Sequence, residues 1–474
     1  MTVRTSVPGS GYGNVYVDSL IWGGTAWNPS QPIRVYFGRG SDFEAASAIH
    51  EPHHEYQPLR SGAAARAWTT KEMQAFTSAL SVFSKVCGLV FVRADTVQEA
   101  DIVWWKTRLY DGTLGAHETP AKGQIWGYFD PTQESWKHLG RGGDGFNTII
   151  HELGHSMGLA HPQDGGEQGD ATRFPGVTSS FDTGSYGLNQ GIWTVMSYNT
   201  GWDKAPNDIS YGAQKGLGAF DIAALQALYG PNGAAASGHD TYNLPTRNGS
   251  GTGWSCIWDT GGSDTISGAR SAESVVIDLR AASLSPGKNA AGFVSHQSDV
   301  SGGYTIANGV VIENAIGGKG ADQLIGNGAA NRLKGNAGAD TLKGSAGDDV
   351  LRGNAGNDVL TGGAGLDAFV FDVAPNSRTN KDRITDFNAA DDAIWLDDRI
   401  FTKLGAGSSS EPVALKSAYF SLKGHKDGND YLAYSRKTGV LSYDADGSGA
   451  AHSAVEIAIL KPKLKMTALD FFLV

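Results

Sequence analysis

Apolar residues recur along the first half of the chain with the periods of helices and strands. In residues 70–86 they stand three and four positions apart, which predicts an amphipathic helix. We expect two further helices over residues 145–160 and 217–228, the second closed by Gly230-Pro231. Strand-like runs surround the first helix at 33–37, 89–92, 102–105 and 124–129. Up to about residue 230, the pattern therefore predicts a mixed α/β fold.

After residue 230 the pattern changes to a repeat of nine residues. Its units begin at Gly317, Gly326, Gly335, Gly344, Gly353 and Gly362. Position six is an aspartate in every unit except the second, which has Asn331, and position eight is always apolar. A flexible glycine-rich linker would not keep this phase. The period is typical of calcium-binding parallel β-rolls, so we expect one here, with strand-like patterns returning at 384–387 and 455–460.

Composition and charge narrow the possible classes of protein. The 474 residues are too many for one ordinary core, so we expect two or more domains. The net charge of −11 argues against a nucleic-acid partner and is compatible with binding many hard cations. We expect no membrane span, because no run of 18 apolar residues occurs. Cys87 and Cys256 could pair, but two buried free thiols are the expected state.

A zinc-binding motif stands inside the second predicted helix. Residues 151–161 read HELGHSMGLAH, which places His151 and His155 four residues apart on one helical face. Gly158 can adopt a left-handed conformation, ending the helix so that His161 can supply a third nitrogen. Three protein ligands leave a coordination position open, as in catalytic zinc sites. Glu152 is then the general base, which takes a proton from water and passes it to the leaving amine.

The remaining histidines do not share this spacing, and we interpret them as ordinary core or surface residues: His50, His53, His54, His117, His138, His239, His296, His425 and His452.

The motif HExxHxxGxxH followed by Met196-Ser197-Tyr198 resembles the metzincin clan of zinc proteases. By that resemblance Met196 forms the Met-turn below the metal. Tyr198 is then a further zinc ligand at rest and stabilises the oxyanion during catalysis. The glycine-rich half selects the serralysin family within this clan. The stretches GYGNVYVDSLIWG, LGAFDIAALQALYGPN, IWDTGGSDT and VIENAIGG are similar to that family, and residues 38–60 look like an insertion.

The resemblance implies an α+β metzincin zinc-protease domain followed by an all-β parallel β-roll. We expect a short propeptide-like segment at 1–15, the catalytic domain at 16–245 and the roll at 246–474. The predicted function is a secreted zinc endopeptidase that acts on extracellular proteins. The alternative is a secreted calcium-binding adhesion or surface-layer module whose protease domain is inactive.

Calcium ligands are expected in the loops of the repeat, where glycines allow turns that expose backbone carbonyls and aspartates add charge. Loops 18 residues apart would stack and share an ion, and the Asn331 unit should bind more weakly. The expected ligands in the repeat are Gly318, Gly320, Asp322, Gly335, Gly338, Asp340, Gly344, Gly347, Asp349, Gly353, Gly356, Asp358, Gly363, Gly365 and Asp367. The family resemblance adds sites at the head of the roll with Asp240, Asp259, Gly261, Gly262, Asp264, Val311 and Glu313. Residues 444–449 form either a calcium loop or a turn.

Substrate and partners follow from the same resemblance. We expect residues 124–129 to be the edge strand beside the cleft and to bind an extended peptide through Gln124, Ile125, Trp126 and Gly127. Other expected partners are a small periplasmic protein inhibitor and a type I exporter, with the enzyme itself a monomer. The N-terminus lacks the apolar core of an export signal, whereas Asp470 and the four apolar residues after it resemble a type I secretion signal. The same residues could also form a terminal strand packed on the roll.

Overall fold

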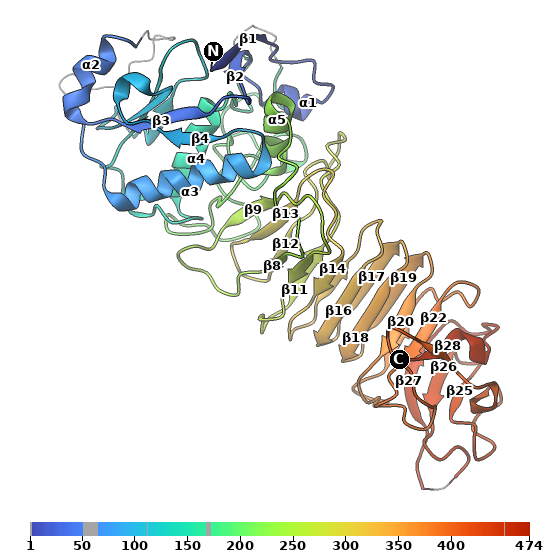
Figure 1. Ribbon diagram of the computed structural model, residues 1–474. Helices are drawn as coiled ribbons and strands as arrows, with labels where there is room; N and C mark the ends of the chain where they lie inside the picture. The colour runs from blue at the N-terminus through green and yellow to red at the C-terminus, as the bar shows by residue number, and fades with distance from the viewer. Residues whose placement is uncertain (1, 51–64, 111, 167–171, 450) are drawn as a thin grey trace.

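The computed structural model describes residues 2–50, 65–110, 112–166, 172–449 and 451–474. The molecule is elongated, with the helices gathered at the N-terminal end and strands alone over most of the C-terminal end (Figure 1). Residues 51–60 of the predicted insertion, which include His53 and His54, lie outside the described residues. No helix in the described part of the chain is long and apolar enough to cross a membrane.

Within the described residues, the N-terminal half forms five α-helices and seven strands. The helices are α1 (Val15–Asp18), α2 (Phe43–Ser47), α3 (Thr70–Val86), α4 (Asp144–Ser156) and α5 (Ala219–Tyr229). The strands are β1 (Val3–Val7), β2 (Gly24–Trp27), β3 (Ile33–Phe37), β4 (Phe91–Arg93), β5 (Ile102–Lys106), β6 (Gly115–His117) and β7 (Ile125–Phe129). The predicted helix at 70–86 is confirmed with both ends in place, because Thr69 caps it and accepts from the backbone N–H of Glu72.

The five-stranded sheet has the order β4-β3-β5-β7-β6, and β6 is its antiparallel edge strand. The prediction that residues 124–129 form the edge is therefore wrong. β7 pairs with β5 on one side and β6 on the other, so its backbone hydrogen-bonding groups are already used. The sequence missed β6 because three residues reading Gly-Ala-His carry no strand pattern.

Helix α4 ends four residues before the predicted end. Met157 is its C-cap, and Gly158 has φ 86°, the left-handed conformation that the motif predicted. The chain then runs beside the segment that follows α1. There Leu159 forms an isolated β-bridge with Ile21, and the Ala160 N–H donates to the carbonyl of Leu20 at 3.0 Å. This reversal carries His161 back toward the helix.

The part of the C-terminal half that the structure describes forms 21 strands. They are β8 (Thr241–Asn243), β9 (Trp254–Ile257), β10 (Thr265–Ser267), β11 (Val275–Asp278), β12 (Ser295–Gln297), β13 (Gly303–Ile306), β14 (Asn314–Ile316), β15 (Gln323–Ile325), β16 (Arg332–Ala337), β17 (Thr341–Ala346), β18 (Val350–Ala355), β19 (Val359–Ala364), β20 (Ala368–Phe371), β21 (Asp382–Ile384), β22 (Ala393–Leu396), β23 (Val413–Ala414), β24 (Phe420–Ser421), β25 (Leu432–Tyr434), β26 (Val440–Tyr443), β27 (Val455–Ile459) and β28 (Phe471–Leu473).

The repeat builds a two-sheet parallel β-roll. β14, β16, β18, β20 and β22 are neighbours in one sheet, and β15, β17, β19 and β21 are neighbours in the other. Successive strands therefore alternate between sheets, and residues 18 apart stand in register, as for Leu333 and Leu351. The apolar residues at position eight point between the sheets and are at most 1% exposed: Leu324, Leu333, Leu342, Leu351, Leu360 and Phe369. This core explains why the phase of the repeat is kept.

The end of the chain is part of this fold. β28 lies between β22 and β23, and Phe471 and Leu473 are buried. The expectation of a terminal strand packed on the roll is confirmed, and a secretion signal in the same residues stays a prediction. The division at residues 15 and 245 also stays a prediction. Both cysteines are free thiols, as expected, but only Cys87 is buried, and Cys256 is half-buried.

Candidate active site and metal centres

The three histidines of the motif converge on one point. His161 Nε2 lies 3.2 Å from His151 Nε2 and 3.1 Å from His155 Nε2. His151 and His155 come from the same face of α4, and His161 comes from the segment after the Gly158 turn. Three imidazole nitrogens pointing at one location form the donor set of a catalytic zinc site.

The other nitrogen of each ring is held by a fixed acceptor. His151 Nδ1 lies 2.8 Å from the carbonyl of Val195, and His155 Nδ1 lies 2.9 Å from the carbonyl of Leu159. His161 Nδ1 lies 2.8 Å from the carboxylate of Asp164. With Nδ1 as donor in each ring, the lone pair of each Nε2 is left for a cation.

Burial keeps the imidazoles of His151 and His155 neutral. It lowers the pKa of His151 to about 4, with repulsion from His161 adding to the effect, and lowers the pKa of His155 well below its usual range. Neutral imidazole is the form that binds a metal ion. The geometry, the tautomers and the protonation state therefore fit zinc without rearrangement of the ligands.

Glu152 lies beside this point. It lines the same cleft of about 430 Å³ as the three histidines, together with Gly115, Tyr128 and Tyr198. Its side chain is buried, and burial raises the pKa of its carboxyl to about 8. A Cβ at Gly115 would approach Glu152 Cγ to 2.7 Å, so β6 packs directly on the carboxyl group. A carboxyl held at the edge strand next to three metal donors suits proton transfer during attack on a bound peptide.

Met196 lies directly under the helix that carries the ligands. It is fully buried, and a Cβ at Gly154 would come within 2.5 Å of its sulfur. The turn before it is anchored by Asp221, which accepts from Thr194 Oγ1 at 2.6 Å and from the Val195 N–H at 2.8 Å. Because the carbonyl of Val195 orients His151, this anchor positions a candidate ligand from a distance.

Tyr198 stands at the rim of the cleft. Its ring centroid is 4.8 Å from that of His161 and 5.8 Å from that of His151, and the residue is 43% exposed. Phe181, which is 72% exposed, lies 6.0 Å from the Tyr198 ring. The phenol is therefore close to the candidate metal position and open to a ligand arriving from solvent.

The four residues expected to bind substrate are buried and occupied in other ways. Gln124 donates to the carbonyls of Val97 and Ala100, and the N–H of Trp126 donates to Glu118. Ile125 pairs with Ile102 of β5, and Gly127 lies against the ring of His117. The structure thus brings none of the four to the cleft surface, whereas Gly115, Ala116 and His117 of β6 line it.

The repeat aspartates form two ladders. Oδ1 of each accepts from the backbone N–H of the residue 18 positions earlier: Asp340 from Asp322, Asp358 from Asp340, Asp349 from Asn331 and Asp367 from Asp349. The Oδ2 atoms of Asp340, Asp349, Asp358 and Asp367 are buried and accept no hydrogen bond from the described residues. Buried oxygens without a donor partner are suited to a bound cation, and calcium prefers such oxygen ligands.

Electrostatics supports the same interpretation. The pKa of Asp340 and of Asp349 is raised to about 7, and that of Asp358 and of Asp367 to about 6. Burial is the main cause, and neighbouring carboxylates add to it for Asp340. Divalent cations between the loops would remove both penalties.

The glycines of the repeat serve two purposes. A Cβ at Gly335, the first residue of its unit, would collide with Oδ2 of Asp340, and the following units repeat this contact. The loop glycines take positive φ, such as 101° at Gly347. The same left-handed range holds the expected ligands Gly338, Gly356, Gly363 and Gly365, whereas Gly318, Gly320, Gly344 and Gly353 do not take it. The fold thus places the expected loops together, and their role as ligands stays a prediction.

An acidic cluster lies at the head of the roll. Asp240, Asp259 and Asp264 each place a carboxylate oxygen within 4.8 Å of the others, and Asp264 Oδ2 is buried without a hydrogen-bond donor among the described residues. Glu313 accepts from the Asp264 N–H at 2.8 Å. The structure thus brings Asp240, one of the ligands expected at the head of the roll, together with Asp259 and Asp264. Gly261 and Gly262 adjoin it with positive φ, and Val311 is exposed nearby in the chain.

Sequence reasoning missed four residues of these centres. Asp382 and Asp392 continue the ladders, accepting from the N–H groups of Asp358 and Asp367. The steps are 24 and 25 residues, so the nine-residue period could not reveal them. Asp164 could have been noticed as the carboxylate three residues after His161, and Asp221 as the acidic residue in the first turn of α5.

Comparison with known proteins identifies relatives of the C-terminal region. Residues 220–409 match the family described as Peptidase M10 serralysin C terminal. Serralysin of Proteus mirabilis is 36% identical over 189 residues, which are 37% of this chain and 34% of that protein. Serralysin B of Dickeya chrysanthemi is 34% identical over 282 residues, 54% of this chain and 53% of that protein.

A third relative, the metalloprotease AprA of Pseudomonas entomophila, is 33% identical over 217 residues, 43% of this chain and 41% of that protein. The chain thus matches between about a third and about half of the length of these relatives. The family match begins in α5, after the three histidines and Tyr198 in the chain. The family match consequently does not include the histidines of the cleft or Tyr198.

Proposed function

We propose that the protein is a zinc-dependent endopeptidase of the serralysin family, because residues 220–409 match the C-terminal region of that family and the similar proteins include serralysins. The observation that carries the proposal is the convergence of three Nε2 atoms beside the buried carboxyl of Glu152 in one cleft. A purely structural zinc site would be closed by a fourth protein ligand, whereas this one opens on a cleft.

His151, His155 and His161 hold the metal, and their Nδ1 partners fix the ring orientations. When bound, zinc would supply positive charge that polarises the scissile carbonyl. The same charge would lower the pKa of Glu152, so that its carboxylate is ionised. Glu152 orients the attacking water and accepts its proton at a carboxylate oxygen. It then delivers that proton to the leaving amine. Tyr198 donates its phenolic O–H to the oxyanion that develops on the substrate.

The substrate is an extended stretch of protein chain that adds to the edge strand β6. Gly115, Ala116 and His117 line the cleft on this strand, and β7 occupies the opposite side of it. Backbone hydrogen bonds from β6 would supply affinity for many sequences. The residues proposed to bind the substrate are therefore those of β6 and not the expected ones of β7.

Calcium ions between the loops of the roll complete the fold. The bare Oδ2 atoms and the raised carboxyl pKa values support this assignment. Extracellular fluids supply calcium at about 10⁻⁴ to 10⁻³ M, the affinity range of extracellular calcium modules. We accordingly propose that the enzyme works outside the cell, with the roll folded by calcium.

The alternative, an inactive calcium-binding adhesion module, predicts no turnover. The test compares casein cleavage by the wild type and by Glu152→Gln, with zinc content measured in each. We expect the variant to keep zinc and lose about 10³-fold or more in turnover, because the proton acceptor is gone. Wild type without chelator-sensitive cleavage would favour the adhesion module, and near-wild-type turnover in Glu152→Gln would remove Glu152 from the mechanism.

A further inference from the structure

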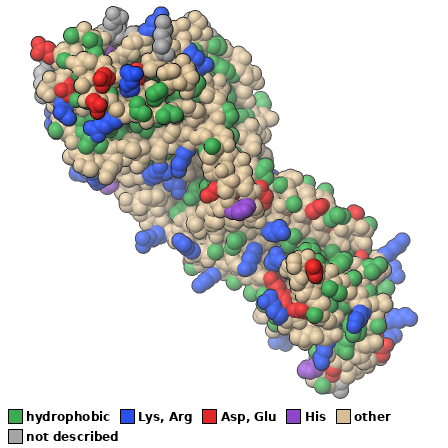
Figure 2. Space-filling view, in the orientation of Figure 1, with side chains coloured by type: hydrophobic (Ala, Val, Ile, Leu, Met, Phe, Trp, Pro, Cys, Tyr) green, Lys and Arg blue, Asp and Glu red, His purple; other side chains and the backbone are tan. Residues whose placement is uncertain are grey.

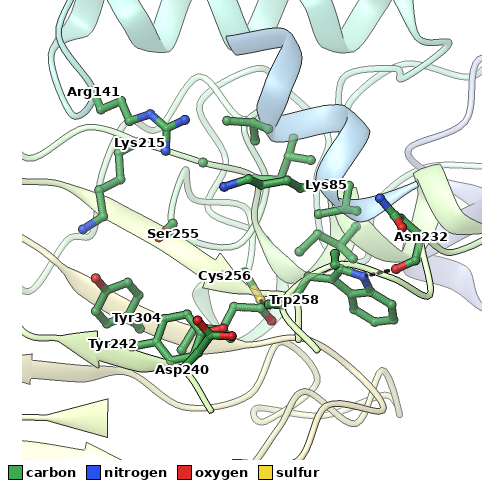
Figure 3. A pocket seen from close by; sticks show the side chains of 18 residues that line it. Lys85, Arg141, Lys215, Asn232, Asp240, Tyr242, Ser255, Cys256, Trp258 and Tyr304 are labelled. Atoms are coloured by element: carbon green, nitrogen blue, oxygen red, sulfur yellow. Dashed lines mark hydrogen bonds between the residues drawn. The ribbon is translucent and has the colours of Figure 1, made fainter. Parts of the chain in front are cut away.

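A second pocket, of about 620 Å³, lies where the helical half of the chain meets the head of the roll (Figure 3). Its walls come from α3, the loop before α4, the segment before α5, and strands β8, β9 and β13. Trp258 closes one side and donates from Nε1 to the carbonyl of Asn232 at 3.1 Å. The two pockets share no lining residue, so this one is distinct from the histidine cleft.

Three basic side chains line one side of this junction pocket. Lys85 comes from the last turn of α3, Arg141 from the loop before α4 and Lys215 from the segment before α5. Figure 3 shows them on the side of the pocket opposite Tyr242 and Asp240. Within the described residues, none of the three forms an ion pair. The pocket therefore concentrates positive charge that the described chain does not neutralise.

The carboxylate on the opposite wall does not offset this charge. Asp240 is drawn into the acidic cluster with Asp259 and Asp264, and its backbone N–H donates to Asp264 at 2.7 Å. Attraction from Asp240 is not among the causes that set the pKa of Lys215, which are burial first and repulsion from Arg141 second. Among the described residues, no ion pair joins Asp240 to any of the three cations.

Lys215 is the most constrained of the three cations. Its backbone N–H donates to the carbonyl of Trp254 at 2.8 Å, which anchors the residue to the roll. Its Nζ sits 4.7 Å from the ring centroid of Tyr304, and its pKa is lowered to about 8. A partly buried ammonium without an anionic partner costs free energy, and an anion beside it would recover that cost.

Arg141 has donors to spare. Its Nη2 makes two long contacts, 3.3 Å to the carbonyl of Ser78 and 3.4 Å to Ser81 Oγ. A guanidinium carries five N–H donors in a planar fork that suits the oxygens of a carboxylate or phosphate group. The hydroxyl of Ser255 also faces the pocket. Three cations around one space match a doubly charged ligand better than a singly charged one.

We propose that the junction pocket is a binding site for a tetrahedral dianion, a sulfate or phosphate group, held between Lys215, Arg141 and Lys85. The apolar walls leave room for more than a bare ion, because Val82, Val86, Ile222 and Ile257 line the same space. The group is accordingly either free or the head of a small ester with an apolar body. A ligand here touches both halves of the chain, so its binding stabilises the junction between them.

The test uses the full-length protein loaded with zinc and calcium. Sulfate is the probe, because it keeps its charge across neutral pH and does not precipitate millimolar calcium. Thermal unfolding is followed over a sulfate titration in which sodium chloride holds the ionic strength constant. A parallel titration at about pH 7.5 uses 4-nitrophenyl phosphate, a phosphate monoester that is mostly a dianion at this pH, since the second pKa of such a group is about 6. We expect a saturable rise in Tm with sulfate, as mass action requires for a ligand that binds the folded state.

Matched variants separate this site from general charge effects. Lys215→Met keeps the apolar stem against Tyr304, and Arg141→Gln removes an exposed charge. Each should weaken the apparent sulfate affinity by at least about tenfold, the effect of losing a charge-assisted hydrogen bond. Lys71→Met, an exposed lysine at the other end of α3, removes the same charge outside the pocket and should change the affinity less than about twofold.

Two outcomes would overturn the proposal: no saturable rise in Tm with either probe, or an equal loss of affinity in Lys71→Met and Lys215→Met. Tighter binding of the ester would identify the apolar body as part of the ligand, and equal binding would identify a free oxyanion. Casein turnover of Lys215→Met should stay within about twofold of wild type, since the pocket shares no residue with the histidine cleft. The zinc assignment can therefore fail without affecting this result.

Discussion

The histidine cleft and the aspartate ladders both offer donor atoms to a cation, but they differ in what holds those atoms in place. Each histidine is fixed by a hydrogen bond at Nδ1, and burial keeps His151 and His155 neutral. The ladder carboxylates are stacked 18 residues apart, and their pKa values are raised mainly by burial and further by neighbouring carboxylates. The cleft is therefore organised before a metal arrives, whereas the roll depends on its metal for stability.

The charges on the visible surface are less concentrated than those at these two sites. On the face seen in Figure 2, the Lys and Arg side chains are scattered along the molecule and form no continuous basic stripe. A nucleic-acid partner would favour such a stripe. The strong local charges of the molecule are instead the buried acidic ladders, the head cluster and the three cations of the junction pocket.

The largest expected effect comes from removing calcium. In a calcium chelator with low zinc affinity, the full-length protein should lose the β-structure of residues 317–371, because the stacked carboxylates repel one another and the glycines favour an unfolded chain. Hydrogen exchange should show this loss in the roll and its reversal by calcium. Protection of the roll that is equal with and without calcium would show that the roll, like the cleft, is organised before a metal binds.

A smaller effect is expected at the rim of the cleft. Tyr198→Phe should lower kcat by about 10²-fold with little change in KM or Tm, the cost of one lost oxyanion donor. Peptide hydrolysis under saturating substrate measures this directly. An unchanged kcat would mean that Tyr198 shapes the rim without touching the reacting atoms.

A variant of Asp164 tests whether hydrogen bonds at Nδ1 organise the cleft before the metal binds. Asp164→Asn removes the charged partner of His161 Nδ1, and loss of such a partner typically lowers metal affinity by about 10-fold to 100-fold. Zinc competition with a chromophoric chelator reports the change, and calcium affinity of the same variant should be unaltered. Retained zinc affinity would show that the buried helix alone organises the ligands.

The smallest expected effect is a pH dependence confined to the calcium-free protein. The ladder aspartates have an ordinary pKa near 3.8 when unfolded and a pKa of about 6 to 7 in the folded roll. The folded state consequently binds more protons between those values, so stability falls as pH rises from about 4 to about 7. In chelator, the small β-structure that remains in the roll, measured by hydrogen exchange, should therefore be greater at pH 5.5 than at pH 8.

Saturating calcium provides the internal control for this titration. With calcium bound, the carboxylates should stay ionised, and the protection of the roll should not increase on acidification over the same range. Residual β-structure in chelator that increases with pH would contradict the sign derived from the raised pKa values.

Local patterns in the sequence were sufficient for much of this fold. Helix α3 follows from apolar spacing and the Thr69 cap, since both act within a few residues. The histidine motif predicted its own turn at Gly158, because helix geometry sets which side chains share a face. The nine-residue repeat predicted the roll for the same reason, as each unit repeats one local conformation and one buried apolar position.

Tertiary contacts decided what those patterns left open. The edge of the sheet is β6 rather than β7 because pairing between distant strands, which leaves no mark on a three-residue segment, selects the outer position. Asp382 and Asp392 join the ladders by stacking after the period has been interrupted. The junction pocket gathers Lys85, Arg141 and Lys215 from separate segments of the chain. The sequence determined the chemistry of each local unit, whereas packing between remote units determined which groups meet, since proximity in space depends on contacts that no local pattern encodes.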